Sequence, residues 1–132
     1  MINKMNIRVA INSEVTKAFT AMCKERGFKP TTVIKYLIEN RGILDNFCEN
    51  IFDNVDAYIE ASKYFIKVSK LPENNGTPYK LTDVDSDVSL KDILRSHGIS
   101  VVFFFCYLVV NQDVFNIMCD SIPSEYKMKK CQ

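Results

Sequence analysis

The sequence predicts a mainly α-helical protein that carries one short strand at its N-terminus and assembles as a dimer. Two observations predict this class. Apolar and polar residues alternate over residues 5–11, which is the period of a β-strand, and from residue 13 onward apolar residues recur at the three- and four-residue steps of a helix. The strand has no partner of similar quality nearby in the sequence. We therefore expect a second copy of the chain to pair with it.

The strand has one apolar and one polar face. One side holds Ile7, Val9 and Ile11, and the other holds Asn6, Arg8 and Ala10. In an antiparallel ribbon built from two copies, the apolar side would lie on the helices and the polar side would be exposed. Such a ribbon fits the major groove of DNA, where arginine pairs with guanine and asparagine with adenine.

Two helices follow the strand. Asn12 or Ser13 offers an N-cap for the first helix, with Glu14 in the first turn, where the helix dipole favours an anion. Gly27 stands where a left-handed residue ends that helix, and Pro30 can begin the second, because proline tolerates the first helical position. Together with Ile7, Val9 and Ile11 of the strand, four residues of these helices would form the dimer core: Phe19, Ile34, Leu37 and Ile38.

This stretch resembles the ribbon-helix-helix family of DNA-binding proteins, of the Arc and MetJ type, and within it the RelB- and DinJ-like branch and the phage or plasmid repressors. The matching residues are Asn6-Ile7-Arg8-Val9 and the segment GFKPTTVI at residues 27–34. They cover the first third of the chain. The resemblance implies that residues 1–44 form a dimerisation and DNA-binding domain and that the two strands of the homodimer enter the major groove.

The resemblance and the chemistry of the residues together give two sets of expected DNA contacts. The base contacts are expected from the outward ribbon face: Asn6, Arg8 and Ala10. The phosphate contacts are expected from the N-terminal arm and the start of the second helix: Lys4, Lys29, Pro30, Thr31 and Thr32. Two residues depart from the family pattern. Ala10 offers only a methyl group, and Lys29 replaces the usual Ser or Thr cap, although its ammonium can reach the same phosphate.

The charges of the chain are unevenly distributed. The 132 residues hold 17 Lys and Arg and 16 Asp and Glu. Residues 1–44 contain eight of these basic residues and only three acidic ones, whereas residues 45–132 contain nine basic and thirteen acidic ones. A basic head on an acidic body indicates that only the head meets a polyanion.

No motif in the sequence indicates catalysis, a cofactor or a metal. The five cysteines are widely spaced and form no Cys-x-x-Cys pair, which favours a reducing, cytoplasmic compartment and thiols that act as small apolar side chains. A phosphate-binding glycine loop, a nucleophile elbow and paired metal ligands are all missing. We therefore expect a protein that is not an enzyme, and we expect His97 to be a helix-terminal residue.

Residues 45–132 are expected to form a helical region with a loop at 71–88. Asn46 and Glu49 resemble a capping box that begins a helix running to residue 68, and Ser89 caps a short helix that Gly98 ends. For Ile99–Val110, β-branched and aromatic residues favour a strand, whereas the continuation to residue 119 has helical spacing. Both remain open, and we favour a helix. Its apolar run is too short to cross a bilayer, so we expect no membrane partner.

Two functions agree with these patterns. The leading one is a sequence-specific regulator that binds double-stranded DNA and represses transcription, of a kind common on phages and plasmids, in which residues 45–132 join two dimers into a tetramer or bind an effector. The alternative is a protein-binding module, such as an antitoxin or a phage-encoded inhibitor of a host protein. A toxin gene downstream would favour the alternative.

Overall fold

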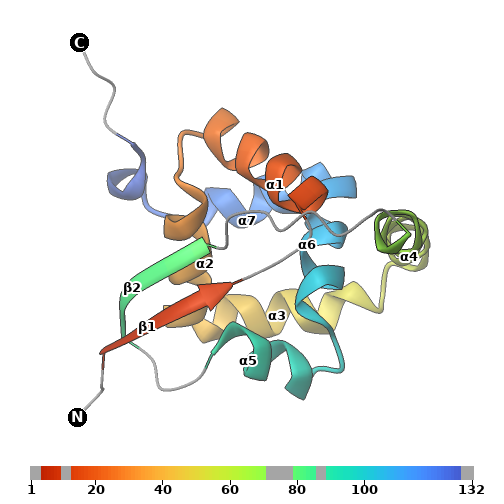
Figure 1. Ribbon diagram of the computed structural model, residues 1–132, viewed down its shortest axis with the longest axis horizontal. Helices are drawn as coiled ribbons and strands as arrows, with labels where there is room; N and C mark the ends of the chain where they lie inside the picture. The colour runs from red at the N-terminus through yellow and green to blue at the C-terminus, as the bar shows by residue number, and fades with distance from the viewer. Residues whose placement is uncertain (1–3, 10–12, 71–78, 86–88, 129–132) are drawn as a thin grey trace.

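The computed structural model describes residues 4–9, 13–70, 79–85 and 89–128, and its main elements are helices (Figure 1). The prediction of a mainly helical chain with a short N-terminal strand is confirmed. The elements in order are β1 (Lys4–Val9), α1 (Ser13–Glu25), α2 (Pro30–Glu39), α3 (Arg41–Ile51), α4 (Val55–Ser69), β2 (Tyr79–Asp85), α5 (Leu90–Ser96), α6 (Val101–Val110), α7 (Gln112–Asp120) and a 3₁₀ turn (Ser124–Tyr126).

The strand β1 pairs with β2 of the same chain, which differs from the expectation in two respects. Residues 79–85, which were expected to lie in a loop at 71–88, form a strand that runs antiparallel to β1. In addition, the backbone groups of β1 find their partner within the chain, so the reason for requiring a second copy no longer holds. Figure 1 shows the resulting ribbon lying in front of α2.

A bulge in β2 explains why its sequence does not alternate like a strand. The register pairs Met5 with Val84 but Ile7 with Leu81, so one residue of β1 faces two residues of β2. An extra residue of this kind shifts the side-chain alternation by one position. Tyr79, Leu81 and Val84 are accordingly all buried, although their spacing changes from two to three.

Two long helices expected from the sequence are each divided in two, and an asparagine stands at the start of the second part in both cases. The helix expected over 46–68 is divided into α3 and α4, and Asn54 caps α4 by accepting a hydrogen bond from the Ala57 N–H at 3.1 Å. The helix favoured over 99–119 is confirmed as helical but is divided into α6 and α7 at Asn111. Asparagine side chains compete for backbone hydrogen bonds and so end helices that hydrophobic spacing alone would continue.

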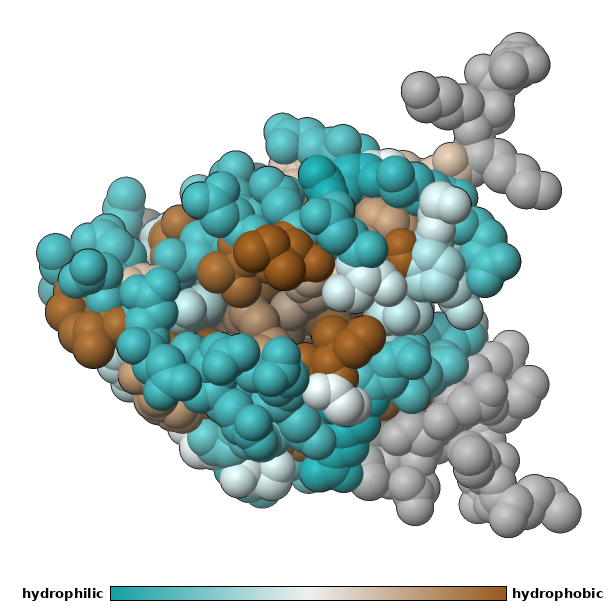
Figure 2. Space-filling model, turned by 180° about the vertical axis from the view of Figure 1, so that it is seen from behind, coloured by the Kyte–Doolittle hydropathy of each residue, from teal (hydrophilic) through white to brown (hydrophobic). Residues whose placement is uncertain are grey.

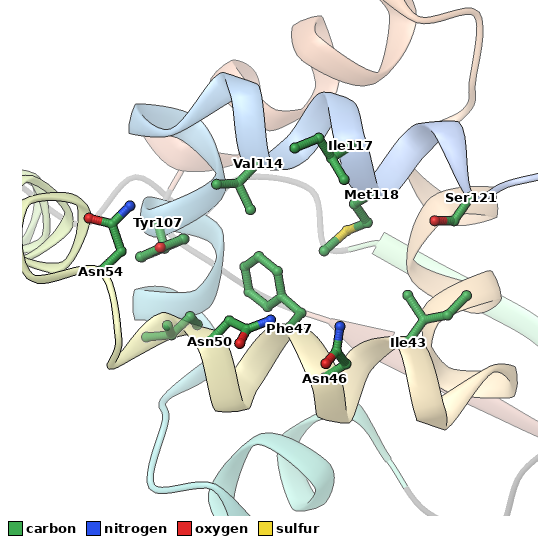
Figure 3. Close-up of a pocket in the computed structure, with 11 residues that line it drawn as sticks. Ile43, Asn46, Phe47, Asn50, Asn54, Tyr107, Val114, Ile117, Met118 and Ser121 are labelled. Carbon is green, nitrogen blue, oxygen red and sulfur yellow. The ribbon is translucent and has the colours of Figure 1, made fainter.

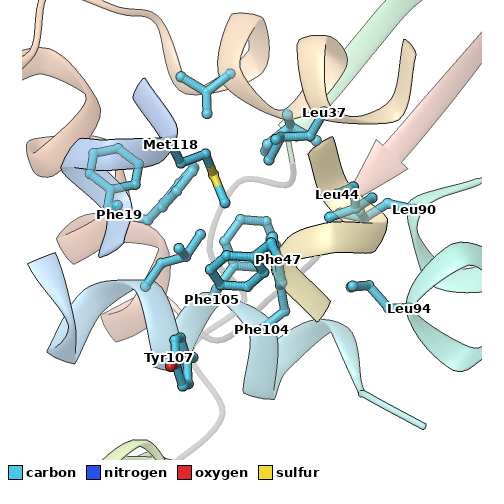
Figure 4. Close-up of a cluster of buried hydrophobic side chains, with 14 of the residues drawn as sticks. Phe19, Leu37, Leu44, Phe47, Leu90, Leu94, Phe104, Phe105, Tyr107 and Met118 are labelled. Carbon is cyan, nitrogen blue, oxygen red and sulfur yellow. The ribbon is translucent and has the colours of Figure 1, made fainter. Parts of the chain in front are cut away.

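One hydrophobic cluster joins both parts of the chain (Figure 4). Phe19 of α1 meets Phe105 of α6 edge-on, with ring centroids 4.7 Å apart, and Phe47 of α3 meets Phe104 at 5.3 Å.

The expected boundary after residue 44 falls inside α3. The residues expected in a dimer core are buried within this single chain: Phe19, Ile34, Leu37 and Ile38. Ile7 and Val9 lie in β1, and Ile11 lies outside the described residues.

The chain contains an internal repeat that relates its two halves. The segment from Gly27 to Ile51 aligns without gaps with the segment from Gly98 to Ile122, and six of the aligned residues are identical. Each counterpart lies 71 residues further along the chain. The identical pairs are Gly27 and Gly98, Tyr36 and Tyr107, Leu37 and Leu108, Asn40 and Asn111, Cys48 and Cys119, and Ile51 and Ile122.

The backbone repeats together with the residues. Gly27 and Gly98 both have positive φ, 84° and 73°, in the left-handed turns that end α1 and α5. Asn40 and Asn111 end α2 and α6 with nearly the same geometry, φ −115° and ψ 62° against φ −116° and ψ 67°. The order is therefore strand, helix, helix, helix, first as β1-α1-α2-α3 and then as β2-α5-α6-α7. Helix α4 lies between the two units.

The described part of the chain contains no single helix that is long and apolar enough to cross a membrane. Helices α5 and α6 together would reach the necessary length and composition, but they are bent by 85° with respect to each other.

Candidate nucleic-acid interface

Tyr79 fixes the β1–β2 ribbon to α1. Its hydroxyl donates a hydrogen bond to the Thr16 carbonyl oxygen at 2.9 Å and lies 2.6 Å from the Thr20 Oγ1. The ring meets Phe19 edge-on with centroids 6.1 Å apart. Burial raises the pKa of Tyr79, against a smaller lowering by the Thr20 hydroxyl. This neutral, buried hydroxyl holds one end of the ribbon at a defined place on the helices.

The register of the ribbon pairs two basic residues. The structure describes the backbone of β1, and its register places Arg8 directly opposite Lys80. Lys80 is exposed, and residues directly opposite each other lie on the same face of an antiparallel pair. Like charges in this position destabilise a ribbon unless an anion lies between them. The arrangement can therefore bind a phosphate or the acceptor edge of a base.

The N-terminus of α2 is a second cationic feature. Lys29 precedes Pro30, is exposed, and leaves α2 without a side-chain cap. The carbonyl oxygen of Lys29 accepts from the N–H groups of Thr32 and Val33, at 3.0 and 3.2 Å. The positive end of the helix dipole and the Lys29 ammonium thus lie at the same terminus, where they favour an anion. The equivalent α6 differs, because Ser100 caps it by accepting from the Phe103 N–H at 3.1 Å.

The structure places the expected DNA-contacting residues on two elements. Lys4, Asn6 and Arg8 belong to β1, and Asn6 stands opposite the bulge of β2. Pro30, Thr31 and Thr32 form the first turn of α2 after Lys29, with Thr31 and Thr32 partly buried. Ala10 lies outside the described residues. Lys80 was not among the expected contacts, because residues 71–88 were expected to form a loop.

A cavity of about 290 Å³ opens on the face opposite the ribbon (Figures 2 and 3). It lies between α3 and α7, which occupy equivalent places in the internal repeat. Figure 3 shows Phe47 and Met118 pointing into it from the two helices. These two residues are counterparts in the repeat, as are Ile43 and Val114 at the rim. The cavity thus lies where the two halves of the chain meet.

The remaining reactive side chains of the described residues have structural roles. Burial raises the pKa of Cys48 and of Cys106 to about 12, so both thiols are protonated and unreactive. His97 Nε2 lies 2.8 Å from Asp45 Oδ1 and joins α5 to α3. Within the described ranges, no group of three or more His, Cys, Asp or Glu residues could hold a metal ion.

Comparisons with protein-family models, with curated proteins and with solved structures find no match to this chain.

Proposed function

We propose that this protein is a regulator that binds double-stranded DNA in a sequence-specific manner and represses transcription, with the β1–β2 ribbon in the major groove. The observation that carries the proposal is the register that places Arg8 opposite the exposed Lys80. The phosphates that line the major groove of DNA would supply the negative charges with which these two basic residues can pair.

The internal repeat supports the same proposal. The ribbon-helix-helix resemblance implies that two strands, each followed by two helices, stand on the DNA together. In this chain β1-α1-α2 and β2-α5-α6 supply both sets, so a single chain carries a complete ribbon. The two sets are not equivalent, because Lys29 precedes α2 whereas Ser100 precedes α6. We therefore expect the DNA sequence bound by one chain to be asymmetric.

The experiment is selection of bound duplexes from a random DNA pool at physiological salt, followed by affinity measurements on the selected site. Arg8→Ala should remove a base contact worth about 1–3 kcal/mol and relax the preference at one position. Lys80→Ala and Lys29→Ala should weaken binding to all sequences and lower the slope of the salt dependence by about one each. Lys67→Ala, an exposed lysine of α4, is the matched control and should change neither.

The same selection separates the proposal from the alternative of a protein-binding module. If the protein enriches no sequence from the pool, the ribbon does not recognise a DNA sequence, and the protein-binding function becomes the better-supported hypothesis. If it enriches a sequence that Arg8→Ala binds with unchanged affinity and preference, DNA is bound by another surface.

A further inference from the structure

Helix α4 has an apolar row on each of two opposite sides. Its buried side carries Ala57, Ala61 and Val68 and packs against α6. Its outer side carries Val55, Ile59 and Ile66, whose surfaces are 63%, 44% and 54% exposed. Figure 2 shows a brown, hydrophobic patch at its left edge, on the side of the molecule where α4 lies. Contiguous exposed apolar rows mark interaction sites more often than single apolar residues do.

The spacing of the outer row is that of a helix-pairing seam. Val55, Ile59, Ser62 and Ile66 follow each other at steps of four, three and four residues, which keeps a seam on one side of two helices that wind around each other. Ser62 has the smallest side chain of the row and lies near its middle. A small residue there allows a second helix to approach closely.

The residues that flank the row would match those of a second α4 that lies antiparallel to the first. One flank carries Asp56 near the N-terminus of α4 and Lys63 one heptad later, and the Lys63 Nζ also lies 3.7 Å from Glu60 Oε1 of the same helix. The other flank carries Tyr58 and Phe65, also one heptad apart. If a second α4 lies antiparallel to the first, each Asp56 meets a Lys63, each Tyr58 meets a Phe65, and each Val55 meets an Ile66. In a parallel pair each residue lies level with its own copy, so neither charge meets its opposite.

We propose that the outer face of α4 docks on α4 of a second copy of this chain, antiparallel and across a two-fold axis. The complementary charges on one flank select a copy of this chain as the occupant, because a two-fold axis forms each charge pair twice. Helix α4 lies outside the internal repeat, and Figure 1 shows it at the end of the molecule away from the ribbon. The dimer therefore leaves the ribbon of each copy uncovered.

The dimer goes beyond the proposed function and is tested without DNA. Sedimentation in the analytical ultracentrifuge measures the dissociation constant of the dimer. Protein concentrations from about 1 to about 100 μM cover the range in which weak dimers dissociate. Asp56→Lys and Lys63→Asp each replace two attractive pairs with two repulsive ones. Each should raise the dissociation constant at least about tenfold, since exposed pairs contribute modestly one at a time. Lys91→Asp, an exposed residue of α5, is the matched control and should leave the dimer intact.

A mixing experiment makes the test independent of any effect of the variants on folding. An equimolar mixture of Asp56→Lys and Lys63→Asp chains should form a heterodimer, because the lysines at positions 56 and 63 of one chain then meet the aspartates at positions 63 and 56 of the other. Ile59→Asp should abolish association in either setting while preserving the helical circular dichroism of the chain. A wild-type monomer throughout the range, an Ile59→Asp dimer, or a mixture that fails to associate would each overturn the proposal.

Discussion

Cys106 shows at the scale of one residue how burial makes the stability of this protein depend on pH. The residue has no exposed surface, and burial raises its pKa from 9.0 to about 12. An unfolded chain ionises the same thiol near 9.0, so above that pH the unfolded state loses a proton that the folded state keeps. The protonated thiol therefore makes its full contribution to the free energy of unfolding below about pH 9, and this contribution is lost as the pH rises towards 12.

We expect the free energy of unfolding to fall above about pH 9, by at most about 1.4 kcal/mol per pH unit for each buried thiol. Urea titrations under reducing conditions, in steps from about pH 7 to about pH 11, measure this decline. Cys106→Ala should be less stable at neutral pH, because it leaves a small cavity, and should decline less steeply. Equal slopes for the variant and the wild type would contradict the assignment of the effect to this thiol.

The turns between helices depend on glycine at the scale of an element. Gly98 has φ +73°, and an added Cβ would meet no atom within 4 Å, so a substitution there is opposed by the backbone conformation alone. Gly98→Ala should lower the free energy of unfolding by about 1–2 kcal/mol. Gly42 lies in α3 with the same open space and no positive φ.

The matched variant Gly42→Ala should therefore raise the free energy of unfolding by about 0.5 kcal/mol, because alanine favours the helix. Thermal unfolding followed by circular dichroism measures both substitutions. Shifts of the same sign would show that the conformation of the turn after α5 is not what requires glycine at position 98.

Local signals in the sequence predicted the elements whose ends are determined by neighbouring residues. Ser89 caps α5 as expected, accepting from the Asp92 N–H at 3.2 Å, and Gly27 and Gly98 end their helices. The strand β2 was missed for two physical reasons. Its bulge breaks the alternation between Leu81 and Val84, and the aspartates around it are typical of a solvated loop. Its partner β1 is also remote in sequence, and no local pattern reports such pairing.

The residues of the candidate interface were likewise predictable where they belong to a local motif, and not where they depend on long-range pairing. Lys29 and Pro30 stand in a local motif, and the structure places them at the start of α2 as expected. Lys80 becomes relevant only through its pairing with Arg8, which depends on the register of β2. The internal repeat is not evident from hydropathy, because the apolar run VVFFFCYLVV of its second copy corresponds to a segment of mixed polarity, PTTVIKYLIE, in the first.

At the scale of the whole molecule, the shared core determines which parts of the chain can fold alone. Phe19 meets Phe105 and Phe115 of the second half, at 4.7 and 5.8 Å between ring centroids. A fragment of residues 1–44 would expose these contacts and would lose the partner strand of β1. We expect it to lack cooperative unfolding and a stable helical signal by circular dichroism. A fragment that folds and dimerises would instead support residues 1–44 as an independent ribbon-helix-helix domain.

The pairing of β1 with β2 also determines the order in which the molecule can be completed. Val9 pairs with Tyr79, which lies far along the chain. Contacts between such distant positions form slowly, because the intervening chain loses entropy when its ends meet. During synthesis β1 leaves the ribosome first and remains unpaired until β2 has followed. The backbone hydrogen bonds within helices α1 to α4 are local and can form transiently in the meantime, before α6 is made and packs on α1 and α4. The ribbon, on which the proposed DNA binding depends, is therefore expected to be among the last surfaces to form.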